Sequence, residues 1–426
     1  LIFKYSHLYT NNKKTLLFWN NYWLITALVV NLIRIIKKIV NIEIGLNKKV
    51  RRAYGIDEIA LVPGVRTLDY DLTNPSWSIG KIEREIPIIA SAMDSVVDVN
   101  TAVELSKLGA LGVLNMEGIQ TRYTNPREIL TQISSVGKKE FVPLMQKIYS
   151  EPIKEDLIIQ RIDEIKEKGG IAALSGTPQA AIKFKETLVK SKIDLFFLQG
   201  TVVSTEHLGM DGKESLNIKN LCQSLKVPVI AGNCVTYEVA NLLMKAGVAG
   251  LMVGIGPGAA CTSRGVLGIG IPQATAISDC SSARDDYFEE TGRYVPIIAD
   301  GGIITGGDIC KCLACGSDAV MIGSPIAKSS SAPGNGFHWG MATPSPILPR
   351  GTRIEVGSTG SLERIIKGPA LLDDGTHNLL GAIRTSMSTL GAKNIKEMQK
   401  VEIVIAPSLL TEGKVYQKAQ QLGMGK

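Results

Sequence analysis

A glycine-rich stretch that ends in a cysteine is the first candidate for chemistry in this sequence. The run Val253-Gly-Ile-Gly-Pro-Gly-Ala-Ala-Cys261-Thr-Ser-Arg264 has glycines at positions 254, 256 and 258. Glycine permits positive φ angles and leaves successive backbone N–H groups free to face an anion. The hydroxyls of Thr262 and Ser263 and the cation of Arg264 follow the cysteine, and such a setting favours the nucleophilic thiolate. The alternative is a tight turn after a strand, with an inert small residue at 261.

Polar side chains also end a series of short apolar runs spread along the chain. The six are Ser91, Gln199, Asn233, Cys261, Asp300 and Ser324. Taken singly, each can be explained as a helix cap or a turn residue. If the runs are the parallel strands of one barrel, all six lie on the rim where barrel enzymes keep their chemistry. The sequence therefore predicts one pocket.

Two glycine-rich turns predict a phosphate site next to that pocket. They lie in Ile298-Ala-Asp-Gly-Gly-Ile303 and in Val320-Met-Ile-Gly-Ser324, after the last two apolar runs. Turns after strands 7 and 8 of a barrel often bind phosphate, and exposed backbone amides suit an anion. Asp300 is placed to accept hydrogen bonds from both hydroxyls of a ribose. The alternative is that Gly301 and Gly302 only make the turn.

The elements that must position these residues alternate between apolar runs and helical patterns, which is typical of parallel strands joined by crossovers. We predict eight strands, at 87–91, 111–115, 171–175, 195–199, 229–233, 250–254, 296–300 and 319–323. The helices expected between them include 99–108, 156–168, 178–190, 237–246 and 307–315, the last ending at Gly316. Eight such units predict an α/β fold, a (β/α)8 TIM barrel with a single catalytic domain. A doubly wound open sheet is the alternative.

Composition and charge limit the classes of function. The chain has 426 residues, 45% of them hydrophobic, which is enough for a full core. Its net charge of +7 comes from residues 1–52, which hold ten Lys/Arg and one acid, so the rest is at −2 and predicts no nucleic-acid partner. The seven cysteines lie between Cys222 and Cys315 without a secretory pattern, so we expect reduced thiols and a cytoplasmic protein. Cys310, Cys312 and Cys315 fit a buried helix better than a metal site, because no second Cys/His pair follows at ligand spacing.

Residues 1–44 differ from the remainder, which we expect to form the barrel domain over 45–426. The apolar run at 22–36 is broken by Asn31 and Arg34, which makes it too short for a confident membrane span. A membrane-surface helix or weak anchor is one interpretation. The favoured interpretation is an over-extended reading frame, with the working protein starting near Asn41; no membrane is expected for the barrel.

These motifs together resemble the IMP dehydrogenase/GMP reductase family. The resemblance covers most of residues 50–402 and keeps the family's order. Its pieces are Ser91-Ala-Met93-Asp94, Ala231-Gly-Asn233-Cys-Val-Thr236, the cysteine loop, Ile298 to Ile303, Met321-Ile-Gly-Ser324 and Gly381-Ala-Ile-Arg384.

The resemblance implies a barrel that binds a purine nucleoside monophosphate, GMP or IMP. Cys261 would attack purine C2, forming a thioimidate, and hydride would pass between C2 and NAD or NADP. Ser263 falls at the family's catalytic threonine, with Thr262 and Arg264 beside it in the catalytic loop. A homotetramer is implied as well.

The resemblance also assigns binding residues. Asp300 would hold the ribose, and Gly301, Gly302, Gly323 and Ser324 the phosphate. Ser91, Met93, Asn233 and Met341 would line the substrate pocket, and His338 falls where the family presents a tyrosine to the phosphate. Gln199, Gly254 and Gly256 would face the cofactor. The backbone carbonyls of Gly256, Gly258 and Cys261 would hold a monovalent cation such as K+.

Departures from the family pattern bear on the reaction. The residues between Met116 and Gly170 are too few for the cystathionine-β-synthase-type pair that many dehydrogenases insert there. Gln199 replaces an acid that faces the nicotinamide, and Ala259 replaces a phosphate-binding serine.

The flap expected near 340–360 contains no Arg-Tyr pair of the kind that activates water in the dehydrogenases. This favours a GMP reductase-type reaction over IMP oxidation. The reductases' flap glutamate is absent too, and Glu355 or Glu363 are the candidates to replace it.

Two further classes of function stay open. The turns at Asp300-Gly-Gly and Gly323-Ser324 also suit a flavin phosphate, which would make the chain an FMN-dependent barrel oxidoreductase. A non-catalytic nucleotide-binding paralogue is the other, although the intact Cys261 argues against it. His207 and His338 are the histidines nearest the expected site, and a solvated loop is the favoured interpretation of His207.

Overall fold

The structure is a computed structural model that describes residues 42–44, 46–204, 217–340, 352–407 and 413–425. The chain divides into two compact units, Leu1–Ala53 and Tyr54–Lys426. The described part of the first unit contains β1 (Ile42–Glu43) and β2 (Lys49–Val50), which pair antiparallel. Residues 1–41 lie outside the described residues, so the interpretation of 1–44 as an extension stays a prediction.

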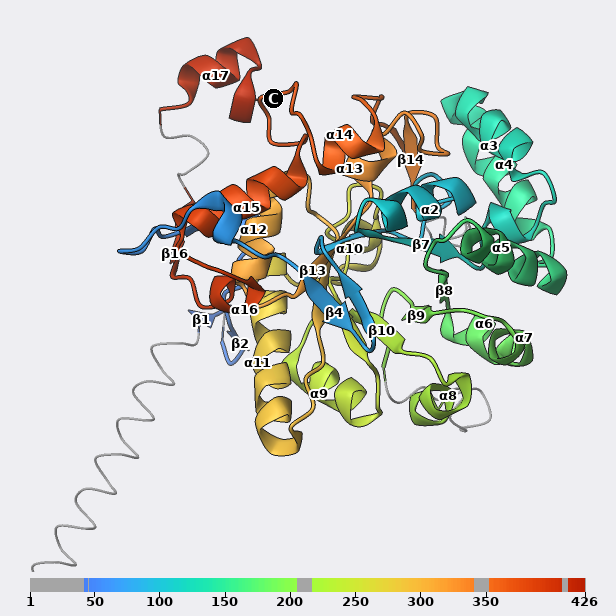
Figure 1. Cartoon of the computed structure of the whole chain (residues 1–426), viewed down its shortest axis with the longest axis horizontal. Coiled ribbons are helices and arrows are strands. Elements are labelled where there is room, and N and C mark those ends of the chain that lie inside the picture. The colour runs from blue at the N-terminus through green and yellow to red at the C-terminus, as the bar shows by residue number, and fades with distance from the viewer. Residues whose placement is uncertain (1–41, 45, 205–216, 341–351, 408–412, 426) are drawn as a thin grey trace, which may run out of the picture. The chain divides into compact units, whose positions relative to one another are not determined.

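Eight parallel strands of the second unit close into a barrel (Figure 1). They are β6 (Ile88–Ala90), β7 (Leu111–Asn115), β8 (Ala173–Gly176), β9 (Leu195–Gln199), β10 (Val229–Cys234), β11 (Gly250–Val253), β12 (Ile297–Asp300) and β13 (Ala319–Ile322). The last strand pairs with the first, Val320 opposite Ile88 and Met321 opposite Ile89. The predicted (β/α)8 barrel is therefore confirmed, and the open sheet is excluded.

Alternate side chains of these strands enter two different apolar clusters, as strand geometry requires. In β9, Leu195 and Phe197 pack in one cluster, while Phe196 and Leu198 pack in the other, which includes the helices. The first cluster also contains Trp77 of the hairpin β4 (Trp77–Ile79) and β5 (Ile82–Arg84), whose indole N–H donates to the carbonyl of Ile86 at 3.0 Å. These strands are buried on both faces, which explains their continuous apolar sequences.

The helices after the strands follow the predicted pattern with one difference. They are α2 (Val99–Lys107), α5 (Glu155–Glu167), α6 (Pro178–Lys183), α7 (Lys185–Lys190), α8 (Ile218–Leu225), α9 (Tyr237–Lys245), α11 (Gln273–Thr291), α12 (Gly306–Ala314) and α15 (Leu379–Thr389). The single helix predicted over 178–190 is wrong, since Phe184 leaves the helical conformation at ψ 19° and the residue is only 2% exposed. Cys310 and Cys312 lie buried in α12, and burial raises the pKa of Cys310 to about 11.

The chain also forms helices and strands that are not part of the eight strand–helix units. Between β7 and α5 the chain forms a helical hairpin, α3 (Pro126–Ser135) and α4 (Lys138–Ser150), and β14 (Phe337–Trp339) pairs antiparallel with β15 (Arg353–Glu355). The remaining elements are η1 (Ile56–Glu58), β3 (Ile59–Leu61), which pairs with β16 (Ile403–Ile405), η2 (Tyr70–Leu72), η3 (Ile119–Thr121), α10 (Ser263–Leu267), α13 (Ser324–Ala327), α14 (Leu362–Ile366), α16 (Ile395–Met398), α17 (Val415–Gln420) and η4 (Gly423–Gly425). Within the described ranges, no helix has the length and apolar character needed to cross a membrane.

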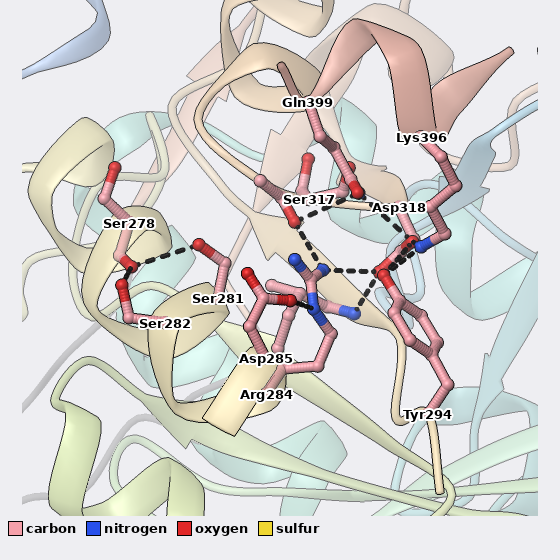
Figure 2. A network of polar contacts seen from close by, with 12 residues as sticks. Ser278, Ser281, Ser282, Arg284, Asp285, Tyr294, Ser317, Asp318, Lys396 and Gln399 are labelled. Carbon is pink, nitrogen blue, oxygen red and sulfur yellow. Dashed lines mark hydrogen bonds and ion pairs between the residues drawn. The ribbon is translucent and has the colours of Figure 1, made fainter. Parts of the chain in front are cut away.

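A buried ion pair ties elements together at the amino-terminal ends of the strands (Figure 2). Asp318 precedes β13, and its Oδ2 lies 3.2 Å from Nη1 of Arg284 on α11 and accepts the backbone N–H of Ile297 at 2.8 Å. Its Oδ1 accepts from Lys396 at 2.6 Å and from the hydroxyl of Tyr294 at 2.8 Å. One carboxylate thus joins α11, β12, β13 and α16, at the end of the barrel opposite the predicted site.

Candidate active site at the carboxyl end of the barrel

The centre of the site is a carboxylate of β12 held by two side-chain amides from β9 and β10. Oδ2 of Asp300, at the end of β12, accepts from Nδ2 of Asn233 at 2.8 Å and from Nε2 of Gln199 at 3.2 Å. The side-chain oxygen Oε1 of Gln199 in turn accepts from the Ser175 hydroxyl at 3.1 Å. In the part of the chain that the structure describes, Oδ1 of Asp300 has no hydrogen-bond partner, so it is available to a ligand hydroxyl.

Burial and hydrogen bonding act in opposite directions on the Asp300 carboxyl. Burial raises its pKa to about 6, and the amide donors of Asn233 and Gln199 oppose the rise because they stabilise the ionised form. The carboxylate is therefore predominantly ionised at neutral pH, where it can act as an acceptor.

Cys261 is exposed in the loop between β11 and α10. Its Sγ lies 3.4 Å from Oγ of Ser263, the first residue of α10, and its backbone N–H donates to the carbonyl of Gly258 at 2.9 Å. Thr262 occupies the N-cap position of this short helix, without a capping hydrogen bond from its side chain. The loop thus presents a thiol to solvent with a hydroxyl beside it.

Glycine is required where this loop leaves the barrel. A Cβ placed on Gly254, which has φ +144°, would lie 2.2 Å from the carbonyl oxygen of Asp300. The Gly254 carbonyl accepts from Nδ2 of Asn233 at 2.6 Å. Cβ atoms on Gly301 and Gly302 would lie 3.1 and 3.0 Å from Pro257, so the turn after β12 packs directly on the cysteine loop.

Arg264 supports the loop from within. Its Nε donates to the carbonyl of Ile255 at 3.2 Å and its Nη2 to the carbonyl of Ile271 at 2.9 Å. A Cβ on Gly256 would lie 2.6 Å from Cγ of Arg264, so glycine there makes room for the arginine. The catalytic role expected for Arg264 stays a prediction, since its side chain joins two parts of the loop.

The second glycine-rich turn meets β14. A Cβ on Gly323 would lie 2.8 Å from Cε1 of His338 and 3.3 Å from Sδ of Met93. His338 is buried, which lowers its pKa to about 4, and among the described residues its Nδ1 has no partner. Ser324 begins α13, and the backbone N–H of Ser91 donates to the carbonyl of Ile322 at 3.0 Å.

The structure thus brings the expected residues to one rim in three groups. Gln199, Asn233 and Asp300 are bonded to one another, the cysteine loop packs on Gly301 and Gly302, and Gly323 contacts His338 and Met93. Met341 and His207 lie outside the described residues. Glu355 and Glu363 are exposed on β15 and α14, and no contact in the described part of the chain connects either to Cys261.

Sequence reasoning missed two residues of this rim, Ser175 and Gln273. Gln273 begins α11, is only 3% exposed, and donates to the carbonyls of Val253 at 2.7 Å and Asp300 at 3.4 Å, joining the ends of β11 and β12. No local pattern distinguishes it from other glutamines at helix starts. Ser175 ends a predicted strand, as the assigned residues do, so that position could have indicated it.

Fold and site together define a class, a barrel protein whose carboxyl rim carries an exposed cysteine on the loop after the sixth strand, a carboxylate held by two amides, and glycine-rich turns. Residues 53–343 match the family described as the IMP dehydrogenase/GMP reductase domain. The chain belongs to this family of oxidoreductases.

Relatives support this placement over most of the chain. An uncharacterized oxidoreductase of Mycolicibacterium smegmatis is 40% identical, with 85% of this chain and 99% of that protein covered. An inosine-5'-monophosphate dehydrogenase of Cryptosporidium parvum is 29% identical, with 87% of this chain and 96% of that protein covered. The crystal structure of an IMP dehydrogenase/GMP reductase-like protein from Corynebacterium glutamicum has a TM-score of 0.82 and 33% identity, covering 86% of this chain and 98% of that one.

Proposed function

We propose that this protein is a purine-nucleotide oxidoreductase that forms a covalent thioimidate between Cys261 and purine C2, with hydride exchange to a nicotinamide cofactor. The favoured reaction takes GMP, NADPH and two protons to IMP, ammonium and NADP+. The observation that carries the proposal is the geometry around Asp300. Asp300, whose carboxylate has one oxygen without a partner in the described residues, ends β12 directly before the Gly301-Gly302 turn, and that turn packs on the loop that carries the exposed Cys261.

Each group of residues has a role in this reaction. Asp300 accepts hydrogen bonds from the ribose hydroxyls through its free oxygen, and Asn233 and Gln199 hold it in place. The turns at Gly301-Gly302 and Gly323-Ser324 receive the phosphate, and the buried, neutral His338 lies beside the second turn. Ser91 and Met93, after β6, line the nucleotide pocket.

Covalent chemistry begins when the Cys261 thiolate adds to the electron-poor C2=N of the purine. In GMP reduction the C2–N bond to the amino group then breaks, the amine takes up the two protons of the overall reaction and leaves as ammonium, and a thioimidate remains. Hydride arrives at C2 and the C–S bond breaks, which returns the thiolate. Ser263, 3.4 Å from Sγ, is the nearest hydroxyl that can donate to or accept from the reacting groups.

The residues near Cys261 are compatible with a nicotinamide. Cys261 is exposed, and a Cβ placed on Gly258 would meet only the Cys261 Cβ, at 3.8 Å, so space is open beside the thiol. Gln199, Gly254 and Gly256 are the residues proposed to face the cofactor, which supplies or accepts the hydride. The carbonyls of Gly256, Gly258 and Cys261 are proposed to hold K+, and the Gly258 carbonyl already accepts one N–H bond from Cys261.

Oxidation of IMP by NAD and water to XMP is the second candidate. The name of the Cryptosporidium parvum relative supports it. The sequence 343–357, which has no Arg-Tyr pair, favours reduction of GMP.

The two reactions are distinguished by following the nicotinamide absorbance with GMP plus NADPH and, separately, with IMP plus NAD. We expect turnover with the first pair, while turnover with the second pair alone would reverse the assignment. A yellow protein that releases FMN on denaturation would replace both with flavin chemistry. Nucleotide binding without turnover by either pair would indicate the non-catalytic paralogue.

A further inference from the structure

The helical hairpin α3–α4 packs against the strand pair β14–β15. Trp339 of β14 shares one buried apolar cluster with residues of the hairpin and of the segment before it, namely Ile119, Leu130, Ile133, Phe141, Met145, Ile148 and Tyr149. Arg353 of β15 donates to the carbonyl of Val136 at 2.7 Å, and its guanidinium lies 4.9 Å from the ring centre of Phe141 and 4.5 Å from that of Phe337. Both strands are therefore anchored on the hairpin.

A chain of buried hydrogen bonds runs through this contact. The indole N–H of Trp339 donates to the Tyr149 hydroxyl at 3.3 Å, and that hydroxyl donates to Oδ2 of Asp94 at 2.5 Å. Oδ1 of Asp94 accepts the backbone N–H of Ile119 at 3.0 Å. Asp94 and Trp339 are each only 2% exposed. Burying an ionised carboxylate costs free energy unless hydrogen-bond donors surround it. The hydrogen bond from Tyr149 lowers this cost for Asp94, so breaking it is unfavourable.

The neighbours of these residues contact the proposed phosphate turn. His338 precedes Trp339 on β14, and successive side chains on a strand point to opposite faces. Met93 precedes Asp94 in the loop after β6. While Trp339 and Asp94 face Tyr149, His338 and Met93 face Gly323.

We propose that Asp94, Tyr149 and Trp339 are positioning residues that hold β14 on the α3–α4 hairpin and thereby fix His338 against the Gly323-Ser324 turn. The inference rests on the proposed function, because that turn is the proposed site of the nucleotide phosphate. It assigns a role to the hairpin, which occupies the stretch between β7 and α5.

The pKa of the Asp94 carboxyl also reflects the hydrogen bond from Tyr149. Burial raises this pKa to about 6, and the hydrogen bond from Tyr149 is the largest influence opposing the rise. Loss of the Tyr149 hydroxyl leaves both the carboxylate and the Trp339 indole without that partner.

Calorimetric titration of GMP and of IMP into wild type, Tyr149→Phe, His338→Ala and the double variant tests the inference. We expect Tyr149→Phe to weaken nucleotide binding about 10-fold, because β14 no longer holds His338 against the proposed phosphate turn. If Tyr149 acts through His338, the double variant binds no more than about 2-fold more weakly than His338→Ala alone. Additive losses, or an unchanged affinity in Tyr149→Phe, would overturn the inference.

Tyr123→Phe is the matched control. The Tyr123 hydroxyl donates to the carbonyl of Ile148 at 3.0 Å in the same helical region, and it makes no hydrogen bond to Asp94 or Trp339 among the described residues. The control loses the same group from a less buried site, so we expect a smaller loss of melting temperature than in Tyr149→Phe, together with wild-type nucleotide affinity. Weakened binding in Tyr123→Phe would indicate a general loss of packing instead of positioning.

Amide hydrogen exchange of residues 337–339 provides a second readout that needs no nucleotide. We expect these amides to exchange at least about 10-fold faster in Tyr149→Phe than in Tyr123→Phe, because local opening of β14 becomes easier. Equal protection would overturn the inference whether or not nucleotide binds. A wild-type protein that binds neither GMP nor IMP would overturn the proposed function, and the exchange result would still decide whether Tyr149 holds β14.

Discussion

The Asp300 carboxylate is buried, which disfavours its ionised form, yet a ligand needs its second oxygen as an ionised acceptor. Asn233 and Gln199 offset part of the cost of burial by donating to Oδ2. The remaining cost is visible in the pKa of the carboxyl, which burial raises to about 6 from an ordinary value of 3.8. At neutral pH, the buried and ionised Asp300 carboxylate therefore lowers the free energy of unfolding.

Asp300→Asn should change the pH dependence of stability. A carboxyl whose pKa is higher in the folded state favours folding when protonated, and this contribution is present below about pH 4 and lost as the pH rises through 6. The melting temperature of Asp300→Asn minus that of wild type should therefore increase between pH 4 and pH 7. One pKa unit corresponds to about 1.4 kcal/mol, so the gain is at most about 3 kcal/mol, and partial exposure of the residue reduces it. A melting-temperature difference that stays constant between pH 4 and pH 7 would contradict a raised pKa for Asp300. Nucleotide affinity should also fall in this variant.

Among the elements, the cysteine loop depends on a glycine that no other residue can replace. Gly254→Ala would place Cβ 2.2 Å from the Asp300 carbonyl at φ +144°. We expect a loss of roughly 2 to 4 kcal/mol in the free energy of unfolding, together with a displaced loop. Urea unfolding and the rate of Cys261 alkylation measure the two effects.

Gly265→Ala is the control for this loop. Gly265 lies in α10, and a Cβ there meets nothing within 4 Å. Alanine in a helix is favoured over glycine by about 1 kcal/mol, so this variant should be as stable as wild type or slightly more so. If both variants lose stability equally, the close approach of β11 and β12 at Gly254 is not what requires glycine.

The strands could be predicted because each is a continuous apolar run ended by a residue that stops it. Parallel strands then place their carboxyl ends on one rim, so the approach of Gln199, Asn233 and Asp300 followed from topology alone. The contact between Tyr149 and Trp339 could not be predicted, because it joins residues 190 positions apart through a hairpin and a three-residue strand. Phe184 was missed for a related reason, since burial of its ring in the tertiary fold outweighs the local preference for one continuous helix.

For the whole molecule, the two ends of the barrel have separate tasks. Asp318 and Arg284 form their ion pair at the amino-terminal ends of the strands (Figure 2). The candidate site lies at the carboxyl ends of the strands. Such a division is typical of barrels, where one face carries stability and the other chemistry.

Asp318→Asn should therefore destabilise the protein without weakening nucleotide binding. The Arg284 side chain is 4% exposed and would lose its buried carboxylate, which costs about 3 kcal/mol or more. Asp285→Asn is the control, because Asp285 pairs with the same arginine from a side chain that is 62% exposed and should contribute less than about 1 kcal/mol. Chemical unfolding and calorimetric titration measure the two properties, and a parallel loss of affinity in Asp318→Asn would contradict the separation of tasks.

The most direct test of the proposed function is the rate of nicotinamide turnover in Cys261→Ala compared with wild type, using GMP plus NADPH and IMP plus NAD. The variant should still bind the nucleotide, because Asp300 and the glycine-rich turns are intact. Its turnover should fall at least about 1000-fold, since the covalent route through the thiolate is gone. Turnover within about tenfold of wild type would contradict covalent catalysis by Cys261.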